Sequence, residues 1–237
     1  MADFTGKNVL VLGGSRGIGE AIVRRFAAGG ATLAFTYAGS KDAAAALAAD
    51  TGAEAIQTDS ADREALIATV AGRGALDVLV ISAGTLVMGD PLTLDPDAVD
   101  QMIDINVRAP YHAAVEAARR MNDNGRIIVI GSVNGDRMPF PGGAAYALTK
   151  SAVQGMVRGL ARDFGDRGIT VNAVQPGPTN SDMNPADGPM AELMHSQMAI
   201  KRHAQVSEIA ELTAFIAGPH GAMITGSFQS IDGGFGA

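Results

Sequence analysis

The stretch NVLVLGGSRGIGEAIVRRF, residues 8–26, decides the fold. Its first five residues predict a buried strand, and a helical pattern starts near Gly17. Between them lies a loop whose glycines, at Gly13, Gly17 and Gly19, are spaced GxxxGxG rather than the commoner GxGxxG. Glycines permit a tight turn and let a pyrophosphate approach the backbone at a helix N-terminus. The loop suits dinucleotide binding, although a plain turn in another α/β protein would also suit it.

The alternation of strand and helix continues along the chain. Strands that are apolar throughout and separated by helices indicate a parallel sheet covered on both faces. Right-handed crossovers then give a doubly wound α/β fold of the Rossmann type with about seven strands. We expect strands at 8–12, 32–36, 54–58, 77–81, 126–131, 170–175 and 227–231, and helices at 17–29, 41–51, 62–72, 95–121, 145–165 and 206–217.

No linker composition or internal repeat divides the chain, so one domain is expected over 1–237. Its one long irregular connection is 176–205, and loops at strand ends in such folds are usually functional. We expect a substrate lid around 179–205. Methionines at 183, 190, 194 and 198, with Pro189 able to open a short helix, suit plain packing as well as an adaptable substrate pocket. His195 and His203 are expected at the surface or against substrate.

Composition excludes several classes of protein. A net charge of −7 argues against nucleic-acid binding, and the lack of cysteine excludes disulfides and cysteine-ligated metals. The start MADFTGK has no apolar signal region, and the apolar-rich run VLVISAGTLVM is about half the length of a membrane span. We expect a cytoplasmic protein with no membrane or nucleic-acid partner and no metal.

The end of the second predicted strand bears on cofactor choice. NAD-binding proteins place an acid there for the ribose 2′-OH, but TYAGSK at 36–41 has no carboxylate before Asp42. Arg16 in the glycine loop, together with Ser40 and Lys41, suits the 2′-phosphate of NADP. The alternative is that Arg16 and Lys41 are ordinary surface charges.

AYALTK at 145–150 places Tyr146 and Lys150 one turn apart on one helix face. Such pairs are often structural. An ammonium about 4 Å from a phenolate would stabilise it by about 4 kcal/mol at an effective dielectric of about 20, which would make the tyrosine a useful acid near neutral pH. Ser132 follows the fifth predicted strand, fourteen residues before Tyr146.

The long predicted helix 95–121 contains a proline. Asp95 suits an N-cap and Pro96 the first helical position. Pro110 has no N–H, so it cannot bond the carbonyl of Asn106. That carbonyl could hold a water, or the proline could simply bend the helix.

Together these pieces resemble the short-chain dehydrogenase/reductase family over essentially the whole chain. The residues that carry the resemblance are GGSRGIG at 13–19, Asp59, SAG at 82–84, Asn106, Ser132, Tyr146, Lys150, VQPGP at 174–178 and DGG at 232–234. The resemblance implies an oxidoreductase that interconverts a carbonyl and a secondary alcohol with NADP(H).

It further implies a tetrad. Ser132 would hydrogen-bond the substrate carbonyl, Tyr146 would donate the proton, Lys150 would hold the nicotinamide ribose, and Asn106 would hold a relay water. Asp59 would bind adenine, and Thr179 would lie near the carboxamide. The expected cofactor contacts are Gly13, Ser15, Arg16, Gly17, Ile18, Gly19, Tyr37, Ser40, Lys41, Asp59, Ser60, Ser82, Ala83, Gly84, Tyr146, Lys150, Pro176, Gly177 and Thr179. The family also implies a homodimer or homotetramer through helices 95–121 and 145–165.

The chain departs from the family pattern in three places. Leu12 stands where a threonine is usual, and Ile81 and Ser82 replace two asparagines. Ser132 lies about one residue further from Tyr146 than in many members, which bears on how Ser132 is aimed.

A narrower resemblance concerns IGSVNGDRMP, VQPGP and MAIKRH, which are similar to members described as binding cyclic di-GMP. It implies an alternative function: a cyclic di-GMP-binding regulator of biofilm dispersal on a reductase fold. The segment RMND at 120–123 has an RxxD spacing seen at some cyclic di-GMP sites, but so short a pattern arises easily by chance.

Overall fold

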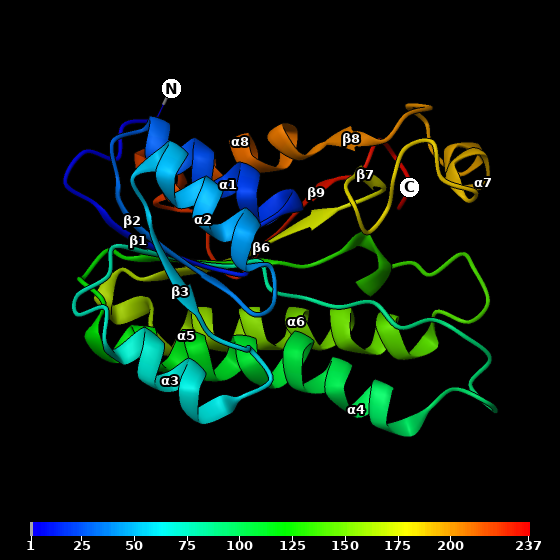
Figure 1. Ribbon diagram of the computed structural model, residues 1–237, viewed down its shortest axis with the longest axis horizontal. Helices are drawn as coiled ribbons and strands as arrows, with labels where there is room; N and C mark the ends of the chain where they lie inside the picture. The colour runs from blue at the N-terminus through cyan, green and yellow to red at the C-terminus, as the bar shows by residue number, and fades with distance from the viewer. Residues whose placement is uncertain (1) are drawn as a thin grey trace.

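The computed structural model describes residues 2–237. Seven parallel strands form one sheet in the order β3-β2-β1-β4-β5-β6-β9, with helices on both faces (Figure 1). The strands are β1 (Asn8–Leu12), β2 (Thr32–Tyr37), β3 (Glu54–Gln57), β4 (Val78–Ile81), β5 (Arg126–Ile130), β6 (Thr170–Pro176) and β9 (Phe228–Ile231). The predicted Rossmann-type fold and its seven strands are confirmed.

Two helical layers sandwich the sheet. One layer holds α1 (Gly17–Ala28), α2 (Lys41–Thr51) and α8 (Val206–Ala217), and the other holds α3 (Arg63–Ala71), α5 (Ala109–Arg120) and α6 (Ala144–Asp163) (Figure 1). Val9 and Val11 pack into the first layer, whereas Leu10 and Leu12 pack into the second. Burial on both faces explains why the strands are apolar throughout.

Residues 95–121 do not form the one continuous α-helix that the sequence predicts. The segment consists of α4 (Pro96–Ile103), a π-helical turn (Asp104–Arg108) and α5. At the turn the Ala109 N–H donates to Asp104 O, five residues back. Pro110, which has no N–H, follows at once, so the helix absorbs the missing bond as a π-bulge. The start is as predicted, since Asp95 caps the Asp97 N–H.

The long connection 176–205 contains a small second sheet, which holds its two ends together. In it β7 (Thr179–Asn180) pairs in parallel with β8 (Ala204–Gln205). Between them lies the short helix α7 (Ala191–Ser196), which begins two residues later than Pro189 would have allowed. Of the four methionines only Met198 is buried, where it packs with Val133 and Phe235, so the predicted stripe is not one continuous face.

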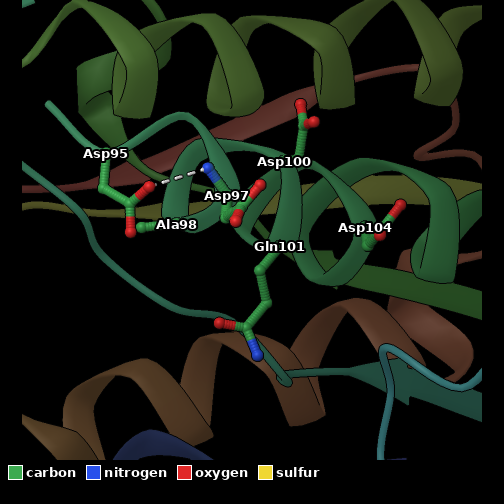
Figure 2. Close-up of a pocket in the computed structure, with 6 residues that line it drawn as sticks. All are labelled: Asp95, Asp97, Ala98, Asp100, Gln101 and Asp104. Atoms are coloured by element: carbon green, nitrogen blue, oxygen red, sulfur yellow. Dashed lines mark hydrogen bonds between the residues drawn. The ribbon is translucent and has the colours of Figure 1, made fainter.

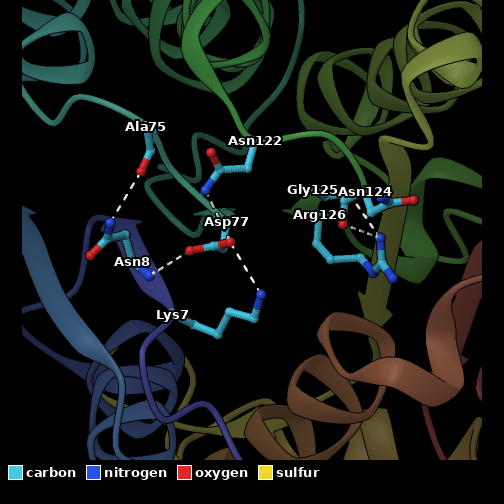
Figure 3. A network of polar contacts seen from close by, with 8 residues as sticks. All are labelled: Lys7, Asn8, Ala75, Asp77, Asn122, Asn124, Gly125 and Arg126. Atoms are coloured by element: carbon cyan, nitrogen blue, oxygen red, sulfur yellow. Dashed lines mark hydrogen bonds and ion pairs between the residues drawn. The ribbon is translucent and has the colours of Figure 1, made fainter.

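A polar network closes the amino-terminal edge of the main sheet (Figure 3). The Asp77 carboxylate accepts from Asn8 N at 2.8 Å and from Lys7 Nζ and Asn122 Nδ2, both at 3.2 Å. Arg126 Nη1 donates to Asn124 O and Gly125 O. In residues 2–237 no helix is long and apolar enough to cross a membrane.

Candidate active site

The predicted site residues gather at the opposite, carboxyl-terminal edge of the sheet. Gly13 follows β1, Ser82 follows β4, Ser132 follows β5 and Gly177 follows β6. Because the order of strands reverses at β1, this edge contains the topological switch point where doubly wound folds bind ligands.

The glycine loop allows no larger side chain at two positions. A Cβ on Gly19 would lie 2.0 Å from Gly13 O, and one on Gly13 would lie 2.6 Å from the Ala83 backbone. At Gly17 the nearest atom would be Ser181 Cβ, 3.7 Å away. The loop is therefore closely packed at Gly13 and Gly19 and has space at Gly17, as a phosphate cradle requires.

Thr36, which the sequence analysis missed, fixes this loop. Its Oγ1 accepts from Gly13 N at 2.9 Å, and its carbonyl accepts from Gly14 N at 2.8 Å. Leu12, where the family usually has threonine, is buried in the core. Thr36 on the neighbouring strand thus supplies a hydroxyl to the loop, and its polar side chain in the apolar run TLAFT was the available signal.

Neither helix start beside this loop is capped by a side chain. Arg16 is the exposed N-cap of α1 and Ser40 the N-cap of α2, and neither makes a side-chain capping bond. Lys41 is exposed and Tyr37 half-buried, and the first carboxylate after β2 is exposed Asp42. Uncapped N–H groups with nearby cations favour phosphates. These residues fit NADP(H), with Arg16 and Lys41 available to its 2′-phosphate.

The residues predicted to contact the adenine and the nicotinamide carboxamide follow β3 and β6, at the same carboxyl-terminal edge of the sheet. Asp59 is exposed, and its carboxylate accepts from Ala61 N, while Ser60 is half-buried. Thr179 is buried and donates from Oγ1 to Gly177 O at 3.0 Å. Gly177 leaves no room for a Cβ, which would lie 2.7 Å from Asp232 Cα. The PGPT turn is therefore held rigidly against the DGG segment.

Lys150 lies buried at the centre of the site. Its Nζ donates to Ile130 O at 3.2 Å and lies 5.7 Å from the centroid of the Tyr146 ring. A Cβ placed on Gly84 would be 3.7 Å from Nζ and 3.4 Å from Asn106 Oδ1. The SAG turn, Lys150 and Asn106 therefore meet at one point. Within residues 2–237, Ile130 O is the one hydrogen-bond partner of the ammonium, which leaves two of its N–H groups for a ligand.

Asn106 ties three segments together. Its Oδ1 accepts from Thr85 N, and its Nδ2 donates to Thr85 O, each at 2.9 Å, and to Thr149 Oγ1 at 3.1 Å. Thr149 Oγ1 donates in turn to Tyr146 O at 2.8 Å. The side chain of Asn106 thus locks the π-turn to the SAG loop and to α6. The relay water on its backbone carbonyl stays a prediction.

Ser132 is buried, and its Oγ accepts the Asn134 N–H at 3.1 Å. That bond occupies a lone pair and leaves the hydroxyl proton to be donated elsewhere. A free hydroxyl proton of this kind can polarise a carbonyl oxygen through a hydrogen bond.

Hollows elsewhere on the surface have different chemistry. One lies along α4 and carries Asp95, Asp97, Asp100 and Asp104 (Figure 2). Such a cluster of carboxylates repels an anionic dinucleotide. A second hollow mixes acidic and basic side chains, and it is lined by Ser60, Ala61, Asp62, Arg63, Glu64, Asp104, Arg108, Ala109 and His112.

Of the two expectations for His203, the surface or a contact with substrate, the first is wrong. Its side chain is buried, and its Nδ1 lies 2.8 Å from His195 Nε2 of helix α7. Burial, and secondarily the nearby His195, lowers the pKa of His203 below its usual 6.5. His203 directly precedes β8, which pairs with β7, so the histidine pair ties α7 to this small sheet.

The RxxD segment does not present unpaired side chains. Arg120 Nε bonds Glu116 at 3.1 Å, and Asp123 pairs with Arg167 at 2.9 Å. Both residues are therefore engaged within the protein.

Comparisons with known proteins agree with this geometry. The family model described as enoyl-(acyl carrier protein) reductase matches residues 13–236. The cyclic-di-GMP-binding biofilm dispersal mediator protein of Escherichia coli K12 is 62% identical over 237 residues, which is 100% of both chains. A crystal structure of BdcA in complex with NADPH has a TM-score of 0.98 at 62% identity, covering 99% of this chain and 96% of that one. A short-chain dehydrogenase of Burkholderia cenocepacia J2315 in complex with NADP has a TM-score of 0.97 at 45% identity, covering 99% of each chain.

Proposed function

The chain belongs to the short-chain dehydrogenase/reductase family, and on that premise we propose that it is an NADP(H)-dependent oxidoreductase interconverting a carbonyl compound and a secondary alcohol. The observation that carries the proposal is the meeting of Lys150 and Asn106 at Gly84, with Tyr146 one helical turn away, beside an open glycine loop. Relatives with NADPH or NADP bound support the choice of cofactor.

In the proposed reaction the cofactor, when bound, supplies or accepts the hydride. Ser132 donates a hydrogen bond from Oγ to the substrate carbonyl oxygen, and Tyr146 transfers its phenolic proton to that oxygen. Lys150 binds the nicotinamide ribose with its remaining N–H groups and stabilises the tyrosinate that forms. Arg16 and Lys41 hold the 2′-phosphate, and residues 179–205 close over the substrate as a lid.

The direct test is consumption of NADPH by the purified protein with a panel of ketones and 1,2-diketones. Oxidation of NADPH that depends on a carbonyl compound supports the proposal, and the alcohol product identifies the class of substrate. Binding of NADPH without turnover of any compound would remove the enzymatic part of the proposal.

A second function has a specific observation in its favour, namely the relative described as binding cyclic di-GMP. Cyclic di-GMP is a dianion, and the glycine loop with the uncapped N-terminus of α1 and the exposed Arg16 offers it backbone N–H groups and a cation together. The RxxD side chains are already ion-paired. We therefore place any cyclic di-GMP in the cofactor cleft, where it would compete with NADPH.

Calorimetric titration of cyclic di-GMP into free and NADPH-saturated protein tests this placement. Competition is expected, and Arg16→Ala should weaken both ligands. Undiminished affinity in the saturated protein would place the site elsewhere.

A homodimer or homotetramer is part of the proposal. Tyr111 on α5, Leu148 on α6 and Phe215 on α8 are 48%, 58% and 49% exposed. Large apolar side chains exposed on three helices favour association. Analytical ultracentrifugation would establish the number of subunits.

A further inference from the structure

A short turn sets the direction of the Ser132 hydroxyl. A single 3₁₀ turn, Val133–Gly135, follows Ser132 directly. Within it Asn134 N donates to Ser132 Oγ, and Gly135 N donates to Ser132 O at 3.1 Å. The direction of the Ser132 hydroxyl therefore depends on what holds this turn against the helix that carries Tyr146 and Lys150.

Gln175 on β6 holds the turn from one side. Its side chain is buried, with Nε2 3.2 Å from Ser132 O and 2.9 Å from Asp136 Oδ2. Both partners are acceptors, so the opposite orientation of the amide would set oxygen against two oxygens. The NH₂ group must therefore face Ser132 and Asp136.

Helix α6 holds the same turn from the other side. Gln154 Nε2 donates to Asp136 Oδ1 at 2.7 Å, and Ser151 Oγ donates to Gly135 O at 2.7 Å. A Cβ on Gly135 would lie 2.9 Å from the Lys150 carbonyl carbon, so backbone packs on backbone there. The turn is thus docked on α6 at the level of Lys150.

We propose that Gln175 is a positioning residue, which through Ser132 O and the Asp136 carboxylate fixes the Ser132 hydroxyl relative to Tyr146 and Lys150. Gln175 acts only as a hydrogen-bond donor to protein groups. This inference rests on the proposed function, because it assumes that Ser132 and Tyr146 act on one carbonyl oxygen.

Gln175→Glu tests the inference with almost no change in volume. The carboxylate would face the Ser132 carbonyl and the Asp136 carboxylate, both of which repel it. With NADPH and the best carbonyl compound of the panel, kcat should fall about 10- to 100-fold, because misplacement by about 1 Å costs that much. The Kd for NADPH should stay within about twofold. Adding Asp136→Asn supplies an amide donor to Glu at 175 and should restore part of the lost kcat.

Gln229→Glu is the matched control. Gln229 lies on the adjacent strand β9, paired with Val174, and its Nε2 donates to Ser227 Oγ. The same chemical change there should leave kcat unchanged. An unaltered kcat in Gln175→Glu, or equal losses of kcat and NADPH affinity, would overturn the positioning role.

Amide hydrogen exchange tests the inference independently of any substrate. In Gln175→Glu, exchange at Asn134 and Gly135 should rise at least about tenfold, while the glycine loop keeps its protection. Unchanged exchange at these two amides overturns the inference. If the unmodified protein reduces no carbonyl compound while Gln175→Glu loosens the turn, the proposed reaction fails and the positioning of Ser132 stands.

Discussion

The two edges of the main sheet use polar groups in opposite ways. At the amino-terminal edge Asp77 accepts from three donors, and Arg126 donates to two backbone carbonyls (Figure 3). Both side chains therefore bind other groups of the protein. At the carboxyl edge Lys150 uses one of its three N–H groups within residues 2–237, Ser132 keeps its hydroxyl proton, and the N-terminus of α1 is uncapped.

The difference separates stabilising contacts from binding capacity. A buried donor without a partner costs about 1–3 kcal/mol. Within residues 2–237 Arg126 Nε lacks a partner, but the same guanidinium is held by two carbonyls. At the carboxyl edge the spare N–H groups of Lys150 lie beside the SAG turn, which packs on the glycine loop, and this indicates a ligand there. The first three predictions below change one edge at a time and measure catalysis, cofactor binding or stability. The fourth concerns the histidine pair.

Tyr146→Phe should have the largest effect. It removes the proton donor but keeps the ring, so kcat should fall about 10²- to 10⁴-fold while NADPH affinity and Tm stay nearly constant. Lys150→Ala should weaken NADPH binding as well, because the same ammonium holds the ribose. Steady-state kinetics with fluorescence titration of NADPH measures both, and a fully active Phe variant on a confirmed substrate would refute the role of Tyr146.

The second largest effect should be a change in the preference for NADPH over NADH. NADPH should bind more tightly than NADH, and Ala38→Asp should reverse the order, changing the ratio of the two Kd values about 100-fold, because the carboxylate repels the 2′-phosphate and accepts from a 2′-OH. Thr32→Asp, at the exposed start of the same strand, is the control. Equal Kd values for the two cofactors in the unmodified protein would argue against the assignment of Arg16.

Asp77→Asn should affect only stability. Loss of the charge-assisted bonds should lower the free energy of unfolding by about 1–2 kcal/mol, with kcat unchanged. Burial would raise the pKa of Asp77, but the bonds from Asn8, Asn122 and Lys7 outweigh it and lower the pKa below 3.8. The stabilisation is thus present above the unfolded-state pKa and is lost as pH falls through the lower folded-state value. Urea unfolding of both proteins at several pH values should show their difference shrinking below about pH 4. A loss of kcat would contradict the division between the edges.

The smallest effect should come from the protonation of the buried His203. Because burial lowers the folded-state pKa of His203, the unfolded state binds more protons in acid, and stability falls as pH drops below about 6.5. At about pH 5.5 the loss should be at most about 1.4 kcal/mol, the limit for one histidine with an unfolded-state pKa of about 6.5, and confined to the residues around the His195–His203 pair. Hydrogen exchange of residues 188–200, corrected for intrinsic rates, should rise between about pH 7.5 and 5.5, and less so in His203→Gln. An equal rise in both proteins would mean that another group titrates.

The sequence predicts the fold well because its pattern is local. Apolar strands such as 8–12 and 126–131 and the helices between them have recognisable periods, and burial on both faces follows from them. The π-bulge at 104–108 could not be predicted from the sequence. Pro110 removes one backbone hydrogen bond, but it does not specify which bonds the neighbouring residues form instead. The strands β7 and β8 have two residues each, too few for any pattern, so the burial of His203 could not be foreseen.

For the site, motif spacing located Ser132, Tyr146, Lys150 and Asn106. It did not find the groups that hold them. Thr85, Thr149, Asp136, Gln154 and Gln175 act through hydrogen bonds between segments distant in sequence. Such pairings depend on the tertiary structure, and nothing in the local sequence marks them.

Hydrogen exchange of the protein with and without saturating NADPH tests the contrast between the edges most directly. We expect strong protection on binding at residues 13–20, 36–42 and 82–86, and none at 75–77 or 122–126. NADPH binding without protection of residues 13–20, or with equal protection at both edges, would contradict a carboxyl edge built to receive the cofactor.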